Sequence, residues 1–280
     1  ANPMETDAPS WHQQQPVLEV AVRRDWSEIS RWASGLYPMG QDLPADLEAL
    51  IREWQQLPDA ESRAAAALRA VQEEVRYFSV LMGESSHRPA APALTWERRY
   101  GDCKDKAWLL SILLRRMGME AEPALVSTSQ GRALDRSVPA ASQFDHVIVR
   151  ATVGGRLFWL DATRSLQRGP LAMRQSSDFG FALPVHSPDP GLVDMASLRD
   201  QRAVQHVVER FLPSADGTSV RLEIETTLRG TEAERRRYDF RSRELSEISR
   251  SYVDYYSRLH GELESAEPIR FEDDPDSGEI

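Results

Sequence analysis

The sequence contains a single cysteine, Cys103, among 280 residues. Intrachain disulfide bonds are therefore excluded, and the lone thiol leaves the redox compartment open. Basic residues are in the minority, because 34 Lys and Arg stand against 44 Asp and Glu, which gives a formal net charge of -10. This balance argues against nucleic acid or an anionic membrane surface as the main partner. No run is apolar enough to span a bilayer, so we expect no direct membrane insertion of this segment.

Sequence motifs for cofactors are also missing. The chain has no HExxH, no P-loop and no GxGxxG run after a strand. The acidic stretch 272–279 matches a calcium loop only in part, because Pro275 separates Asp274 from Asp276 and the remaining ligands are lacking. We therefore assign no metal and no cofactor, and interpret this stretch as an exposed acidic turn. The hydrophobic content of 41% is that of a folded globular protein.

The cysteine lies where a helix is expected to begin. In the run GDCKDKA, residues 101–107, Asp102 is the predicted N-cap and Asp105 completes a variant of the capping box. Apolar residues at three-to-four spacing continue to Met117, and Gly118 follows as a C-cap signal. A thiol in the first turn of a helix lies near unpaired N–H groups and the positive end of the dipole, which favour the thiolate. Cys103 is therefore a candidate nucleophile, and the alternative is a buried cysteine acting as a small hydrophobe.

A predicted β-hairpin supplies a candidate base and acid. Two β-rich runs, 144–153 and 156–163, flank Gly154-Gly155, which is typical of a two-residue turn. Counting outward from this turn makes His146 and Asp161 diagonal neighbours on one face, close enough for the carboxylate to hold the imidazole. A three-residue turn would break this parity. With Cys103, the residues match the logic of a Cys-His-Asp triad.

These three motifs resemble the transglutaminase-like superfamily. The matching runs are GDCKDKA at Cys103, FDHVIV at His146 and FWLDAT at Asp161, in the order that the family uses on a helix N-terminus and two adjacent strands. The chain looks most like the bacterial multidomain branch, in which such a core lies between β-sandwich domains of unknown function. The resemblance covers roughly residues 17–192 well and continues more weakly to the end.

The resemblance implies a papain-like mechanism on amide bonds of peptides or proteins. Members of the superfamily hydrolyse amides, transfer the acyl group to an amine, or have lost activity. Hydrolysis is our first expectation, and a cell-envelope scaffold or binding module with a vestigial triad is the alternative. The family also favours the bacterial periplasm or cell envelope, while the sequence leaves the cytoplasm open. We expect a peptide or protein substrate, and neighbouring domains of a longer chain as further partners.

The predicted fold class is α+β: a papain-like transglutaminase core with helices packed on an antiparallel sheet, then a partial β-containing domain. Residues 1–16 are expected to form a linker or disordered arm, 17–188 the core, and 189–280 a partial β-rich domain with one long helix. Within the core, residues 17–22 are a possible short strand, and apolar stripes predict helices at 27–37, 44–57 and 60–77. Beyond the boundary, 202–211 and 218–228 predict an antiparallel pair, and 231–263 a helix.

Two loops and two side chains complete the expected site. Residues 83–100 are interpreted as a loop that borders the cleft, and 128–143 as its opposite lip; both are expected to act as adaptable lids over an elongated peptide. Acyl chemistry needs an oxyanion hole, for which the backbone N–H of Cys103 is the natural first donor. Tyr77 and Trp96 are weak candidates for the second, and a structural role is the alternative for each.

Overall fold

The computed structural model describes residues 12, 18–79, 87–174, 176–196 and 205–280. Its residues fall into two compact units, one formed by Ala1–Arg164 with Gln175–Asp200 and the other by Ser165–Arg174 with Gln201–Ile280. Helices and antiparallel strands occur together in the chain, which confirms the α+β prediction. The sequence places the domain boundary after residue 188, whereas the sheet of the first unit extends to a strand at Val193–Asp194.

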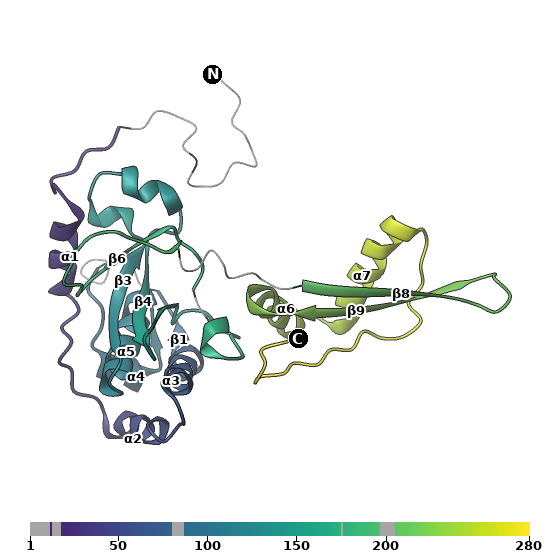
Figure 1. Ribbon diagram of the computed structural model, residues 1–280, viewed down its shortest axis with the longest axis horizontal. Helices are drawn as coiled ribbons and strands as arrows, with labels where there is room; N and C mark the ends of the chain where they lie inside the picture. Colours follow the sequence, from purple (N-terminus) through teal and green to yellow (C-terminus); the bar gives the residue numbers. More distant parts are fainter. Residues whose placement is uncertain (1–11, 13–17, 80–86, 175, 197–204) are drawn as a thin grey trace. The chain divides into compact units, whose positions relative to one another are not determined.

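An antiparallel sheet of five strands forms the centre of the first unit (Figure 1). The strand order is β5-β4-β3-β6-β7, so the hairpin that the sequence predicts lies at one edge. Val153 pairs with Arg156, as expected for the two-residue turn at Gly154 and Gly155, both of which have positive φ. The strands are β3 (Glu120–Val126), β4 (His146–Val153), β5 (Arg156–Leu160), β6 (Phe181–Pro184) and β7 (Val193–Asp194).

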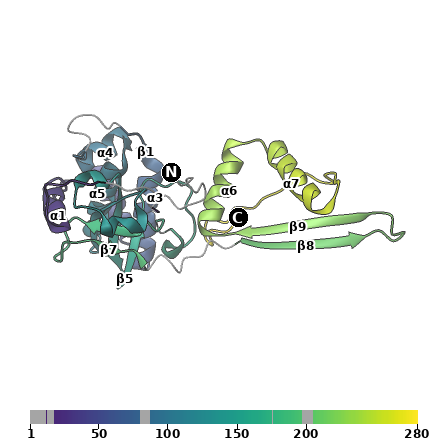
Figure 2. The same ribbon diagram turned by 90° about the horizontal axis from the view of Figure 1, so that it is seen from above.

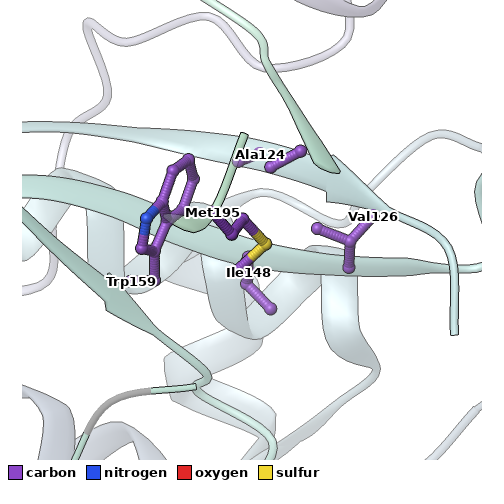
Figure 3. Close-up of a cluster of buried hydrophobic side chains, with 6 residues drawn as sticks. Ala124, Val126, Ile148, Trp159 and Met195 are labelled. Atoms are coloured by element: carbon purple, nitrogen blue, oxygen red, sulfur yellow. The ribbon is translucent and has the colours of Figure 1, made fainter. Parts of the chain in front are cut away.

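Both faces of this sheet are buried. One face carries a cluster of fully buried side chains: Ala124, Val126, Ile148, Trp159, Ala182 and Met195. Figure 3 labels all of these except Ala182. Residues that alternate with these along β3 and β4 point to the other face. Helix α5 (Cys103–Arg116) packs against β3 and β4 there. The sheet thus provides a rigid support on which the start of α5 is held.

Four further helices belong to the first unit: α1 (Trp26–Ser34), α2 (Ala45–Trp54), α3 (Ala60–Glu74) and α4 (Pro92–Arg98). The first three were predicted, and the N-cap of α1 is Asp25. Helix α4 lies in the segment 83–100 that was interpreted as a loop, so this part of the prediction was wrong. The strand considered at 17–22 is absent from its described part, 18–22, where the chain is irregular.

Helix α5 is buried along almost its whole length, from Cys103 to Leu114. A buried helix start needs internal acceptors for its free N–H groups. Asp102 accepts from the N–H groups of Lys104 and Asp105, while the Asp105 carboxylate accepts from the N–H of Asp102 at 3.2 Å, which confirms the predicted capping box. Asp105 also accepts from the N–H of Ala90 at 2.8 Å and from Arg98 Nη2 at 2.6 Å.

Gly101 leaves the space that this arrangement needs. A Cβ at Gly101 would lie 2.8 Å from the Cβ of Asp105, closer than side chains approach one another. Gly101 is also part of a short parallel bridge between β1 (Arg76–Tyr77) and β2 (Tyr100–Gly101), in which it pairs with Tyr77. The glycine of the GDC run therefore allows the capping carboxylate to fold back against the backbone.

The second unit contains a long hairpin and two helices. Strands β8 (Gln205–Pro213) and β9 (Val220–Leu228) pair as predicted, with a turn that includes Gly217 at positive φ. The stretch expected as one long helix is divided into α6 (Gly230–Ser242) and α7 (Leu245–His260). Figure 2 shows both helices on one side of the hairpin. The unit also contains a 3-10 turn, η4 (Leu171–Met173).

The acidic stretch at 272–279 is tied to α6 by one arginine. Arg237 is 4% exposed, and its Nε donates to Asp273 at 2.7 Å while Nη2 donates to the carbonyl of Gly278 at 2.9 Å. The stretch includes a turn, as predicted, but it is an anchored one. Within the part of the chain that the structure describes, no group of three or more His, Cys, Asp or Glu side chains could hold a metal ion.

The carboxylate of Asp105 should be essential to the stability of the first unit. Asp105→Ala would leave the N–H groups of Ala90 and Asp102 and the guanidinium of Arg98 without this acceptor. We expect a loss of roughly 3 kcal/mol in the free energy of unfolding, typical of breaking a buried charged hydrogen-bond network. Denaturant unfolding would measure it, with the exposed helical acid Glu97→Ala as the control. Equal stability of the two variants would contradict the assignment.

Candidate active site

Cys103 is the first residue of α5 and is 8% exposed. The neighbouring Asp102 directs its carboxylate to the second and third N–H groups of the helix, and it also pairs with the ammonium group of Lys104. The first N–H of the helix is that of Cys103 itself, beside the thiol. The local sequence thus places the Cys103 sulfur and the backbone N–H of Cys103 next to each other at the start of α5.

The predicted neighbourhood of His146 and Asp161 is present. His146 is the first residue of β4, and Asp161 directly follows β5. Their side chains meet, with His146 Nε2 2.9 Å from Asp161 Oδ2. The other carboxylate oxygen accepts from the N–H of Thr163 at 2.9 Å and from its hydroxyl at 2.7 Å. Asp161 is therefore held on both oxygens, and it fixes the imidazole by its Nε2 edge.

Hydrogen bonds and charges determine the protonation of this pair. Burial alone would lower the pKa of His146, but hydrogen bonds with Asp161 and with Cys103 outweigh it and raise the pKa to about 10. Burial raises the pKa of Asp161, yet the hydrogen bond and charge of His146 and the Thr163 contacts leave it below its usual value. At neutral pH the arrangement is an imidazolium held between a carboxylate and the cysteine sulfur.

Two buried polar residues behind Asp161 were not identified from the sequence. Gln72 of α3 donates from Nε2 to the backbone carbonyl of Asp161 at 3.0 Å. Lys106 is 1% exposed and donates from Nζ to the carbonyl of Val75, which follows α3. Burial lowers the pKa of Lys106 to about 8, although the negative charge of Asp161 opposes this shift. Its position three residues after Cys103, on the same face of α5, is the sequence signal that could have identified it.

A cavity of about 260 Å³ opens beside Cys103 and His146. The expected lips contribute His87 on one side and Ala141 on the other. A third wall is formed by α1 and the short segment after this helix. The sequence did not identify this wall, because the apolar stripe of α1 is equally typical of a helix that packs in the core. The lining also includes Trp32, Ala33, Leu36, Tyr37, Lys104, Leu125, Phe144, Asp145 and Val147.

The segment 128–143 is anchored, in contrast to the adaptable lid expected from its composition. It forms two 3-10 turns, η2 (Gly131–Arg136) and η3 (Ala141–Gln143), and the side chain of Leu134 is fully buried. Asp145 accepts from the N–H of Thr128 at 2.8 Å and from its hydroxyl at 2.6 Å. Of the opposite segment, residues 83–86 lie outside the described residues, and α4 occupies 92–98.

The two candidates for the second oxyanion donor have different positions. Trp96 is 2% exposed, and its Nε1 donates to Asp46 Oδ2 at 2.8 Å, so its polar hydrogen is already bonded to that carboxylate. Tyr77 is 48% exposed. Burial raises its pKa, and the negative charges of Cys103 and Asp161 contribute, while a hydrogen bond with Ser79 opposes them. The Tyr77 hydroxyl thus lies within electrostatic reach of the site.

Among the residues that the structure describes, no helix combines the length and the apolar character needed to cross a bilayer.

No protein-family model and no curated protein matches the sequence. Among solved structures, the chain is similar to a "putative protease" from Parabacteroides distasonis, with 12% identity and a TM-score of 0.48 over 69% of this chain and 38% of that one. It is also similar to a "putative cysteine protease" from Cytophaga hutchinsonii, with 15% identity and a TM-score of 0.35 over 69% and 56%. A third structure, described as a TGase, is 13% identical with a TM-score of 0.29 over 49% and 37%. The chain thus spans about four tenths to just over half the length of these proteins.

Proposed function

We propose that this protein is a cysteine-dependent amide hydrolase that acts on peptides or flexible protein segments through Cys103, His146 and Asp161. The observation that carries the proposal is the arrangement of His146, whose Nε2 lies 2.9 Å from Asp161 Oδ2 and which lines one cavity together with Cys103. A nucleophile, a base and an orienting acid within hydrogen-bond reach are the combination that acyl transfer requires. A cavity next to them leaves room for a substrate.

The chemistry follows from the charges of this group. The Cys103 sulfur attacks the amide carbonyl carbon as a thiolate, and the imidazolium of His146 gives its proton to the departing amine as the C–N bond breaks. Water then attacks the thioester, His146 takes a proton from that water, and the acid product leaves while the sulfur is regenerated. Asp161 holds the ring in place and stabilises its positive charge throughout. A primary amine in place of water would give acyl transfer.

The oxyanion that forms on the carbonyl oxygen needs donors fixed in advance. In our proposal the N–H of Cys103 is the first donor, since it lies at the free end of α5. The Tyr77 hydroxyl is the second, because its segment is fixed next to the GDC run by the pairing of Tyr77 with Gly101. The indole of Trp96 is not part of the hole, because it binds Asp46.

Thiol reactivity tests the proposal without knowledge of the substrate. Cys103 should be alkylated by iodoacetamide at a pH well below that at which a free thiol reacts. Cleavage of a mixed peptide library, with and without an added primary amine, would then separate hydrolysis from acyl transfer. The enzymatic function would be contradicted if Cys103 were alkylated at the same pH as free cysteine and no peptide were cleaved.

Substitutions of Cys103 and Asp161 should separate chemistry from folding. Cys103→Ala should abolish turnover and leave the thermal unfolding temperature nearly unchanged, because a first-turn residue with a small side chain contributes little packing. Asp161→Asn should lower kcat by roughly 10³-fold or more, because the amide can hold the wrong tautomer of His146. Asp135→Asn, an exposed acid of the same unit, is the control. Unchanged turnover in Asp161→Asn would show that the carboxylate is structural.

Tyr77→Phe should lower kcat by about 10²-fold if its hydroxyl stabilises the oxyanion, and leave the alkylation rate of Cys103 close to that of the parent. Tyr100→Phe is a matched control, since Tyr100 lies on the paired strand and its ring faces Arg98. Steady-state kinetics and alkylation kinetics would be compared for both variants. Equal kcat values in the two variants would exclude Tyr77 from the oxyanion hole.

The stability of the protein should also depend on pH through His146. Its pKa is about 10 in the folded chain and about 6.5 when unfolded, so the folded state binds the extra proton between these values. The resulting stabilisation is complete below pH 6.5 and is lost as pH rises toward 10. From pH 7 to 8, the free energy of unfolding of the parent should fall more steeply than that of Asp161→Asn, by up to about 1.4 kcal/mol.

Across this pH window Lys106, whose folded pKa is about 8, goes from mostly charged to about half charged in the folded state. This loss of a proton opposes the His146 trend, and it occurs in the parent and in the variant, so the comparison of the two curves tests His146. The free energy of unfolding would be measured by denaturant unfolding at each pH. If it changed equally with pH in the parent and in Asp161→Asn, the pair of His146 and Asp161 would not hold a proton.

A further inference from the structure

The cavity beside Cys103 has mostly apolar walls. Tyr37, Leu125 and Val147 line it and are each less than 10% exposed, while Phe144 and Ala141 close another side. Trp32 and Leu36 complete the wall and are partly exposed. Trp32 lies in α1 and Leu36 follows the end of this helix, and both line the cavity. An aromatic and a branched aliphatic group thus lie at the entrance to the site.

The charged groups of the lining already have partners. The ammonium of Lys104 pairs with the Asp102 carboxylate, and both side chains are at most 6% exposed. The Asp145 carboxylate accepts from the N–H and the hydroxyl of Thr128. His87 sets its ring edge-on to Trp32, with ring centroids 5.4 Å apart. The donors on Asp145 are neutral, so its negative charge is not compensated. An acidic substrate group would therefore lose water beside this carboxylate without gaining a free cation.

The wall formed by α1 is rigid. Asp25 caps the helix by accepting from the N–H of Glu28, and Ser30 donates from its hydroxyl to the carbonyl of Pro184 at 2.9 Å. The ring of Tyr37 packs edge-on against Trp108 of α5. These contacts attach the cavity wall both to the sheet and to the helix that carries Cys103. The shape of the cavity is therefore set before a substrate binds.

We infer that this cavity is a specificity subsite for an uncharged apolar side chain, aromatic or branched aliphatic, of a residue flanking the scissile amide. The inference rests on the proposed function and adds the class of peptide that is cleaved. Burying such a side chain against Trp32, Leu36 and Phe144 gains hydrophobic free energy, whereas an acidic one would be buried near the Asp145 carboxylate without a free counter-ion. Leu36 then becomes the residue whose change should alter the preference.

Peptidyl acyloxymethyl ketones test the acyl side, because they label Cys103 in a single turnover. Four probes would differ only next to the ketone, carrying Phe, Leu, Lys or Asp. We expect the Phe and Leu probes to react roughly tenfold or more faster than the Asp probe. Quenched peptides with the same four residues placed after the scissile amide test the leaving-group side. An apolar preference in either series supports the subsite, and the series that shows it identifies the side.

Leu36→Glu sharpens the test by placing a carboxylate in the wall. In whichever series shows the preference, the rate for Lys relative to Phe should rise roughly tenfold or more. For the probes, each rate is divided by the rate of the same variant with iodoacetamide. Leu157→Glu is the matched control, since Leu157 is 37% exposed on β5 and is not part of the cavity lining. It should keep the parent's preference.

The outcomes separate this inference from the proposed function. Activated alkylation of Cys103 by iodoacetamide with no apolar preference in either series would overturn the subsite and leave the nucleophile intact. An equal rate for Lys relative to Phe in Leu36→Glu and Leu157→Glu would also overturn the subsite. A Cys103 that shows no activated alkylation and no labelling by any probe would overturn both.

Discussion

The start of α5 is the constraint on which the site depends. Burying a helix from its first residue to Leu114 removes water from N–H groups that have no partner within the helix. The carboxylates of Asp102 and Asp105 replace that water, and each also makes a contact outside the capping box. Asp102 also neutralises Lys104, while Asp105 gathers the N–H of Ala90 and the side chain of Arg98. Burial raises the pKa of Asp105, and backbone hydrogen bonds oppose that shift. The two capping carboxylates are therefore costly to desolvate and are stabilised by the hydrogen bonds that they accept. They fix the start of the helix, where the backbone N–H and the thiol of Cys103 lie together.

The register of the hairpin determines the positions of the other two side chains, those of His146 and Asp161. Once Gly154 and Gly155 form a two-residue turn, the pairing from Val153↔Arg156 to Val149↔Leu160 follows without further choice. His146 and Asp161 lie just beyond that pairing, at the end of the hairpin remote from the turn. A shift of one residue would send one of them to the opposite face. The fully buried cluster around Ile148 and Trp159 resists such a shift, because it would expose these side chains (Figure 3).

What the sequence could predict is what short-range chemistry determines. The capping box, the helix it starts, the glycine turn and the meeting of His146 with Asp161 each follow from spacings within about 20 residues. The long-range arrangement did not follow. The apolar stripe of α1 is indistinguishable from a core stripe until the helix is seen beside Cys103, and the indole N–H of Trp96 is assigned only when Asp46, 50 residues earlier, is found next to it. Helix α4 was missed because its start has Pro92 and no side-chain cap, so the segment resembles a loop. Lys106 was missed because a lysine in a helix is normally exposed.

Charge and burial act against each other throughout the site, and the balance differs from one group to the next. Lys106, held by the Val75 carbonyl and attracted by Asp161, keeps a lowered pKa because burial wins. His146 shows the opposite result, because two hydrogen-bonded partners outweigh its burial. The outcome is a compact alternation of charges, with the imidazolium between carboxylate and sulfur and the ammonium behind the carboxylate. Such an arrangement is stable only where surrounding groups exclude water without adding unpaired charge. The apolar wall of α1 meets that condition. In the function proposed above, the same wall that would select an apolar substrate side chain would therefore also protect the charge separation on which the proposed attack by Cys103 depends.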